Sequence, residues 1–334
     1  MQITSSSMPR AIAALAAAFC AATALAAGAQ AQGDPAAGWP RQPVKIVVGL
    51  AAGAVNDVQT RVVAAKLAER LGQPVVVENR PGAGGAIAAE LVARAAPDGY
   101  TLYNAPTSTI TVNPAVYSKL PYHPVRDFVA ITQLSVFPLY LVVNAQLPVR
   151  DVKGLLAHAK ANPDKANLAT PGAFFDLMVA ILKIKSGVSF VSIPFKSTPE
   201  TMMAVLNGQA MIAYVEYNTL NPQLKAGKAR ALANTAPTRS AEVPDVPTMA
   251  EAGFPEAVTQ PITGIVAPKA TPPAIVKRLE TEINAVMRMP EVVERFKTMG
   301  IQTVDSNSEK FAKLIETDVK RWTEIAKAAN IKLD

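Results

Sequence analysis

Short β-branched segments alternate with amphipathic helices along the chain, and this order constrains the possible folds more than any other feature. Residues 44–48 read Val-Lys-Ile-Val-Val and predict a buried strand, and residues 57–71 predict a helix that stops at Gly72. Two more strands are predicted at 74–78 and 100–103, with a helix of small residues between them. Strand, helix and strand at this spacing are typical of a parallel sheet with right-handed crossovers, so we expect an α/β fold.

The second part of the chain repeats this alternation. Strands are predicted at 139–143, 167–170, 190–195, 211–215 and 230–235, and helices at 151–161, 174–185 and 199–206. We expect Thr198 to cap the last of these helices. Three helices, at 272–287, 290–299 and 308–329, are predicted to complete the chain, and apolar side chains on one face of the last predict that it docks on a domain.

The N-terminal residues have the pattern of a secretory signal peptide. Arg10 precedes an uncharged, alanine-rich stretch at 11–27, and Ala29-Gln30-Ala31 is a site of the small-x-small kind that signal peptidase cleaves. The alternative is an uncleaved membrane anchor, but the stretch is short and mostly alanine, whereas a spanning helix needs about 20 strongly apolar residues. We therefore predict a signal peptide over residues 1–31 and a periplasmic mature protein.

Composition excludes several classes of function. The single cysteine, Cys20, lies in the predicted signal peptide, and His123 and His158 are the only two histidines. Zinc sites of the Cys/His type need three or four such ligands, so we expect neither a metal nor a cofactor. Lys and Arg number 33 against 26 Asp and Glu, a mild excess without basic runs, so no nucleic-acid partner is expected.

Small residues follow several of the predicted strands, where ligands of α/β proteins bind. The first such loop, residues 49–57, contains Gly53 and ends at Asp57, which either caps the next helix or contacts a ligand. Thr107, Ser108 and Thr109 follow another strand, and Thr170 and Phe195 belong to two loops of the second part. Loops from both parts are expected to face one another and to close on a ligand.

Several motifs resemble one known family. They are Glu78-Asn79-Arg80-Pro81-Gly82-Ala83-Gly84-Gly85, Pro97-Asp98-Gly99-Tyr100-Thr101-Leu102, Val112-Asn113-Pro114, Leu120-Pro121-Tyr122, 227–233 and 244–253. In this order they resemble the substrate-binding proteins of tripartite tricarboxylate transporters, the Bug family, over essentially the whole mature chain.

The resemblance implies a periplasmic binding protein fold of type II, with two α/β domains joined by crossover strands. The expected domains are residues 32–140 together with 255–334, and residues 141–254. It also implies that a monomeric, non-enzymatic receptor captures a small organic carboxylate for a membrane permease of one large and one small subunit. A receptor for a signalling sensor and an enzyme on the same fold are the alternatives.

The resemblance also implies which residues bind the ligand. The expected contacts are Leu50, Ala51, Gly53, Ala54, Asp57, Thr107, Ser108, Thr109, Thr170, Pro171, Gly172, Ala173, Phe174, Phe195, Glu216 and Tyr217. Asp57 stands where the family carries its loop aspartate, so it can both cap the helix and contact the ligand.

Two loops depart from the family pattern. Ala54 replaces a glycine and would be strained at positive φ. Phe174 lies in a shortened loop, where it either forms an aromatic wall for a less polar ligand or fills space.

Overall fold

The computed structural model describes residues 36–333. From Pro40 onward the chain forms one compact unit, and the few described residues before it belong to a separate N-terminal unit. The predicted signal peptide lies outside the described residues. None of the helices in the described part has the length and apolarity that crossing a bilayer requires.

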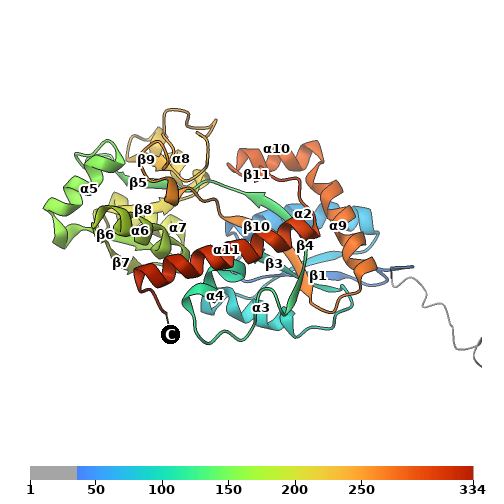
Figure 1. The fold of residues 1–334 in the computed structure, drawn as a ribbon. Helices are drawn as coiled ribbons and strands as arrows, with labels where there is room; N and C mark the ends of the chain where they lie inside the picture. The colour runs from blue at the N-terminus through green and yellow to red at the C-terminus, as the bar shows by residue number, and fades with distance from the viewer. Residues whose placement is uncertain (1–35, 334) are drawn as a thin grey trace, which may run out of the picture. The chain divides into compact units, whose positions relative to one another are not determined.

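The described strands form two sheets (Figure 1). The first contains β1 (Val44–Val48), β2 (Val75–Asn79), β3 (Thr101–Pro106), β4 (Phe128–Val136), β10 (Ile262–Pro268) and β11 (Gln302–Thr303), in the order β11-β4-β10-β3-β1-β2. The second contains β5 (Tyr140–Asn144), β6 (Asn167–Thr170), β7 (Val191–Pro194), β8 (Ile212–Val215) and β9 (Ala229–Asn234), in the order β7-β6-β8-β5-β9.

Both sheets are mixed, which differs from the expected parallel pairing. β1 pairs in parallel with β2 and β3, and β6 pairs in parallel with β7 and β8. β10 instead runs antiparallel to β3 and β4, and β5 runs antiparallel to β8 and β9. The antiparallel pairs involve β4, β5, β9 and β10, the strands that flank the two crossings between the sheets.

Two connecting segments carry the chain from one sheet to the other, and they are hydrogen-bonded to each other. The Leu139 N–H donates to the Thr235 hydroxyl at 3.0 Å, and the Thr235 N–H donates to the Leu139 carbonyl at 2.9 Å. The Phe137 N–H donates to the Pro261 carbonyl at 3.2 Å, and the Thr259 N–H to the Thr235 carbonyl at 2.8 Å. The outgoing and returning segments therefore form one short double-stranded junction.

Helices connect the strands, and most lie where the sequence predicts them. They are α2 (Val55–Leu71), α3 (Ala86–Ala93), α4 (Asn113–Val116), α5 (Val152–Ala161), α6 (Ala173–Ser186), α7 (Thr198–Leu206), α8 (Tyr217–Lys225), α9 (Pro273–Met287), α10 (Pro290–Thr298) and α11 (Ser308–Ala329). Short turns of helix are η1 (Ala83–Gly85), η2 (Ser108–Val112), η3 (Pro163–Lys165) and η4 (Pro255–Ala257).

The ends of two helices test the capping predictions. Helix α2 ends at Gly72, which has φ +67° and donates its N–H to Ala68, as expected for a glycine that terminates a helix. The cap of α7 was assigned to the wrong residue. Ser197 is the N-cap, and its hydroxyl accepts the Glu200 N–H, whereas Thr198 is the first helical residue.

The C-terminal helix α11 contacts elements that belong to both sheets. It packs against β4, a strand of the first sheet, and against the nearby α4, and it also packs against α6, which follows a strand of the second sheet (Figure 1). Phe311, Ile315 and Trp322 are buried on one face of the helix, which confirms the predicted apolar face. Phe311 belongs to the core under the first sheet, with Tyr103, Phe128 and Val266.

The close approach of α11 to β10 requires a glycine at position 264. A methyl group on Gly264 would lie 2.2 Å from Cζ of Phe311 and 2.9 Å from the carbonyl oxygen of Thr132. We expect Gly264→Ala to lower the free energy of unfolding by about 1–3 kcal/mol, since the ring has to move out of a packed core. Urea unfolding of the variant measures this change.

Gly154→Ala is the matched control for this prediction. Gly154 lies in the first turn of α5, and its added methyl group would meet only the Asp151 carboxylate, at 3.2 Å. Equal unfolding midpoints for the two variants would contradict the proposed packing of Phe311.

Candidate functional site

The loop between β1 and α2 is held in place by the carboxylate of Asp57. The carboxylate accepts the Gly53 N–H at 2.8 Å and the Asn79 side-chain amide at 2.9 Å. Arg61, one turn further along α2, forms an ion pair with it at 3.0 Å. The Asp57 side chain is only 3% exposed. The helix begins at Val55 with Ala54 as its N-cap, so Asp57 secures the helix start from the third helical position.

These contacts also set the charge of Asp57. Burial by itself would raise the pKa of this carboxyl, but the hydrogen bonds from Arg61, Gly53 and Asn79 outweigh burial and lower its pKa. Asp57 is therefore ionised near neutral pH, and its negative charge is already compensated by groups of the protein. Its main structural role is to fix the loop.

Asn79 completes this network, and the site residues expected from the sequence did not include it. Its side-chain nitrogen donates to the Leu50 carbonyl as well as to Asp57, and its oxygen accepts a hydrogen bond from Arg61 at 2.8 Å. Asn79 ends β2, the strand next to β1, so its amide reaches across to the neighbouring loop. The sequence carried a signal for it, because Asn79 belongs to the Glu78–Gly85 motif.

The backbone of the loop after β1 is exposed to solvent, and Ala54 adopts an unstrained conformation. Gly53 has φ +83°, a conformation that favours glycine, whereas Ala54 has φ −63°. The strain considered for Ala54 is therefore absent. Ala51 and Gly53 are exposed, and Leu50 is half-buried. The N–H groups in the first turn of α2 have no acceptor within the helix, so this end is a suitable place for an anion.

Thr107, Ser108 and Thr109 lie beside this loop, because they follow β3, the other neighbour of β1. The Thr107 hydroxyl accepts the Ile262 N–H at 2.6 Å, and the Thr109 hydroxyl accepts from Tyr103 at 2.8 Å. Both hydroxyls therefore stabilise the fold. Ser108 is half-buried, and its hydroxyl makes no hydrogen bond to any residue that the structure describes.

A second group of the expected residues follows the parallel strands of the second sheet. Thr170 ends β6, and its hydroxyl both accepts the Gly172 N–H at 3.1 Å and donates to the Gly172 carbonyl at 3.0 Å. This small ring shapes the loop through Pro171 into α6, which begins at Ala173. Phe195 follows β7, and its N–H donates to the Thr170 carbonyl at 2.8 Å. These residues therefore share one edge of the sheet.

Phe174 is packed within the protein. Its side chain is 4% exposed, and its ring meets Trp322 of α11 edge-on, with centroids 5.3 Å apart. Phe175 contacts it at 5.5 Å. The ring thus fills space between α6 and α11, the second of the two roles considered for it. A role as a ligand wall stays a prediction.

Glu216 and Tyr217 follow β8, which lies beside β6 in the second sheet. Tyr217 approaches the connection between α10 and β11 on the side of the first sheet: a methyl group on Gly300 would come within 2.6 Å of its Cβ. This edge of the second sheet therefore faces residues of the first. The Oε2 atom of Glu216 is buried and has no hydrogen-bond partner among the described residues.

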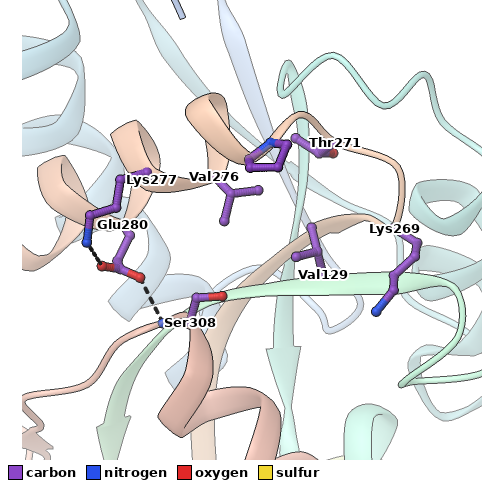
Figure 2. Close-up of a pocket in the computed structure, with 8 residues that line it drawn as sticks. Val129, Lys269, Thr271, Val276, Lys277, Glu280 and Ser308 are labelled. Atoms are coloured by element: carbon purple, nitrogen blue, oxygen red, sulfur yellow. Dashed lines mark hydrogen bonds and ion pairs between the residues drawn. The ribbon is translucent and has the colours of Figure 1, made fainter. Parts of the chain in front are cut away.

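A separate hollow of about 350 Å³ lies away from these loops (Figure 2). It is lined by Val129, Lys269, Thr271, Pro273, Val276, Lys277, Glu280 and Ser308. Its polar groups are largely paired, since Glu280 bonds Lys277 at 2.6 Å and the Ser308 N–H at 2.9 Å. None of the expected ligand contacts lines this hollow.

The Asp57 network gives a testable prediction about stability. Asp57→Ala leaves the Gly53 N–H, the Asn79 amide and Arg61 without their acceptor, so we expect the free energy of unfolding to fall by about 1–3 kcal/mol. Because the folded-state pKa of Asp57 is lowered, its contribution is present above the unfolded pKa and is lost as pH falls through the folded value. The difference in the free energy of unfolding between wild type and Asp57→Ala should therefore become smaller below about pH 4.

Urea unfolding at several pH values measures both effects, with Glu69→Ala as the control. Glu69 lies on the same helix, but its ion pair with Lys66 is exposed, so little change is expected. An Asp57→Ala variant as stable as wild type at neutral pH would rule out the loop-fixing role.

Most of the chain, including these loops, is similar to known proteins. A curated relative from Cupriavidus necator, the UPF0065 protein in the gbd 5′ region, is 37% identical, and the match covers 91% of this chain and 92% of the relative. Protein BugT of Bordetella pertussis is 32% identical over 88% of this chain and 91% of its own.

Solved structures agree with the sequence relatives. The MatC protein of Rhodopseudomonas palustris with bound malate matches with a TM-score of 0.79 and 31% identity, covering 86% of this chain and 99% of that one. A second protein of that species, with adipate, matches with a TM-score of 0.81 and 29% identity, covering 88% and 99%. The periplasmic binding protein BugD matches with a TM-score of 0.79 and 32% identity, covering 88% and 99%.

The likeness to these proteins extends over both sheets, so the expected periplasmic binding protein fold is confirmed. The model of the family described as tripartite tricarboxylate transporter family receptor, TctC, matches residues 59–331. This chain therefore belongs to the tripartite tricarboxylate transporter receptor family.

Proposed function

We propose that this protein is a periplasmic receptor that captures a small organic carboxylate and delivers it to a membrane permease of one large and one small subunit. The observation that carries the proposal is the exposed backbone of the loop after β1, held by Asp57 and Asn79, in a chain whose structural neighbours include proteins with malate and adipate. Backbone N–H groups at a helix start are suited to a carboxylate because they carry partial positive charge.

The charged side chains at the first loop are already paired with one another. Arg61 bonds both Asp57 and Asn79, so its guanidinium is partly neutralised within the protein. Recognition by neutral donors favours a mode in which loop amides and hydroxyls surround the anion and no single salt bridge dominates. Such a site tolerates different carboxylates on one fold, which suits a family of receptors with different ligands.

The proposal extends to the division of the chain. Residues 32–140 with 255–334, and residues 141–254, form the two domains that close on the ligand. The expected contacts at Leu50–Asp57, Thr107–Thr109, Thr170–Phe174, Phe195, Glu216 and Tyr217 belong to the edges of both sheets. Residues 1–31 direct export to the periplasm, where the mature protein acts as a monomer and without catalysis. Turnover of a bound ligand by purified protein would contradict this last point.

Ligand binding is measured directly by thermal unfolding. The mature protein, refolded from denaturant to remove any retained ligand, is heated with malate, adipate, benzoate or nicotinate. A ligand at a hundred times its Kd stabilises the fold by about 2.7 kcal/mol, which should raise Tm by about 4 °C for a protein of this size. The neutral amides of the same acids serve as controls. Equal shifts with acids and amides, or none with any acid, would contradict carboxylate capture.

Ser108 tests where the ligand is held. Because its hydroxyl is not used within the described protein, we expect it to donate to the ligand carboxylate, and Ser108→Ala should weaken binding about 5–30-fold with little change in stability. Ser186→Ala is the control, since that hydroxyl bonds the Leu182 carbonyl on α6, away from the expected contacts. Isothermal titration calorimetry with a ligand found in the thermal screen measures both. Unchanged affinity in Ser108→Ala would remove Ser108 from the site.

A further inference from the structure

The carboxyl group of Glu216 is held at the edge of the second sheet with one oxygen unused. Glu216 is half-buried as a residue, but its Oε2 atom is shut off from solvent and has no hydrogen-bond partner among the described residues. The carboxyl group receives hydrogen bonds from the Thr198 hydroxyl and from its own backbone N–H. The Oε2 atom is therefore a buried polar atom that the described residues leave without a partner.

The charge of this group has no counterpart nearby. Burial raises the pKa of Glu216, and the two hydrogen bonds lower it by less than burial raises it. The titratable and charged groups on the surrounding segments are Glu200 on α7 and Lys196 before it, Tyr217 and Lys225 on α8, Tyr214 on β8, Tyr140 on β5, and Asp176 in the first turn of α6. None of them contributes to the shift of Glu216.

The two cations in this set do not compensate Glu216. Lys225 is the last residue of α8, and Glu216 precedes the first, so the length of the helix separates them by about 13 Å. The Lys196 side chain is exposed. An ionised carboxylate without a cation or a further donor is costly in such a place, whereas the neutral acid needs only an acceptor for its proton.

The position of Glu216 shows where such an acceptor would be found. Glu216 follows β8, next to β6 and its Thr170 loop, and the adjoining Tyr217 lies against Gly300 on the side of the first sheet. We propose that Glu216 binds in its protonated form and donates a hydrogen bond from Oε2 to an oxygen of the ligand carboxylate, so that capture strengthens as pH falls. This inference rests on the carboxylate ligand proposed above.

The proton balance of binding follows from this arrangement. Where free Glu216 is ionised, ligand binding takes up a proton from solution, and the two carboxyl groups share it; where Glu216 is partly ionised, the uptake equals the ionised fraction. Affinity should therefore rise by up to about tenfold per unit fall in pH above the pKa of free Glu216, and level off below it. The ligand must stay ionised over the range used, so malate and adipate are compared between about pH 6 and pH 8.5.

The experiment is calorimetric titration with malate and adipate across this range, in two buffers of different ionisation enthalpy. Wild type should bind more tightly at lower pH and take up a proton. Glu216→Gln keeps the shape and an N–H donor but cannot ionise, so it should bind with a flat pH profile and no proton uptake. Glu309→Gln is the matched control: it makes the same change of side chain at an exposed position in the first turn of α11, away from this edge. It should retain the wild-type slope.

Thr198→Val gives a second, independent readout. Removing the hydroxyl that lowers the pKa of Glu216 should move the pH-dependent region of binding to higher pH. Equal pH slopes in wild type and Glu216→Gln would overturn the inference. So would affinity that rises with pH in wild type and is lost in Glu216→Gln, because that result identifies an ionised Glu216 that receives a cationic group. Wild type that binds no carboxylate at any pH would overturn the proposed function itself.

Discussion

The junction between the two sheets is the constraint on which the rest of the structure depends. Leu139 and Thr235 bond each other in both directions, and Thr259 and Phe137 extend the pairing on either side. The chain leaves the first sheet and returns to it through this one place. The strands that lead into and out of this junction are neighbours in each sheet: β4 pairs with β10 in the first sheet, and β5 pairs with β9 in the second. The antiparallel pairs thus extend the pairing of the junction into each sheet.

The first loop shows how a buried charge can fix the shape of an exposed backbone segment. Asp57 is buried, ionised and paired, and its partners Gly53, Asn79 and Arg61 come from the loop, the next strand and the helix. Those bonds leave the backbone of the loop exposed in a fixed shape. A fixed shape matters for an anion held by several weak donors, since each donor contributes only if it is already aligned.

Sequence reasoning predicted β1, α2, β2 and the C-terminal helices because their apolar residues recur with the regular periods of strands and helices. It missed β4 and β10. In β4 an apolar run at 128–131 is followed by polar residues that are also buried. Thr132 and Ser135 bond Asn284 and Gln59 of the covering helices, so the apolar pattern marks only the first half of the strand. In β10 a glycine makes room for Phe311, a partner nearly fifty residues away.

The site was predicted unevenly for a similar reason. Loops could be located because they follow strands, and the family motif marked Asn79 without giving its role. Which hydroxyls are used internally could not be read from the sequence, because the partners of Thr107 and Thr109 lie on β10 and β3. The unused oxygen of Glu216 is likewise a property of the packed state: it depends on which donors reach the carboxyl group after folding.

The contact between Phe174 and Trp322 has a mechanical consequence. Trp322 lies on a helix whose other end is packed under the first sheet, and Phe174 begins the helix that follows the Thr170 loop. Any rotation of one sheet relative to the other must either keep these two rings together or separate them. If they stay together, the ring pair is a second pivot besides the junction, and two pivots restrict the motion to a single axis. The distance between the loops of the two sheets would then depend on one rotation angle.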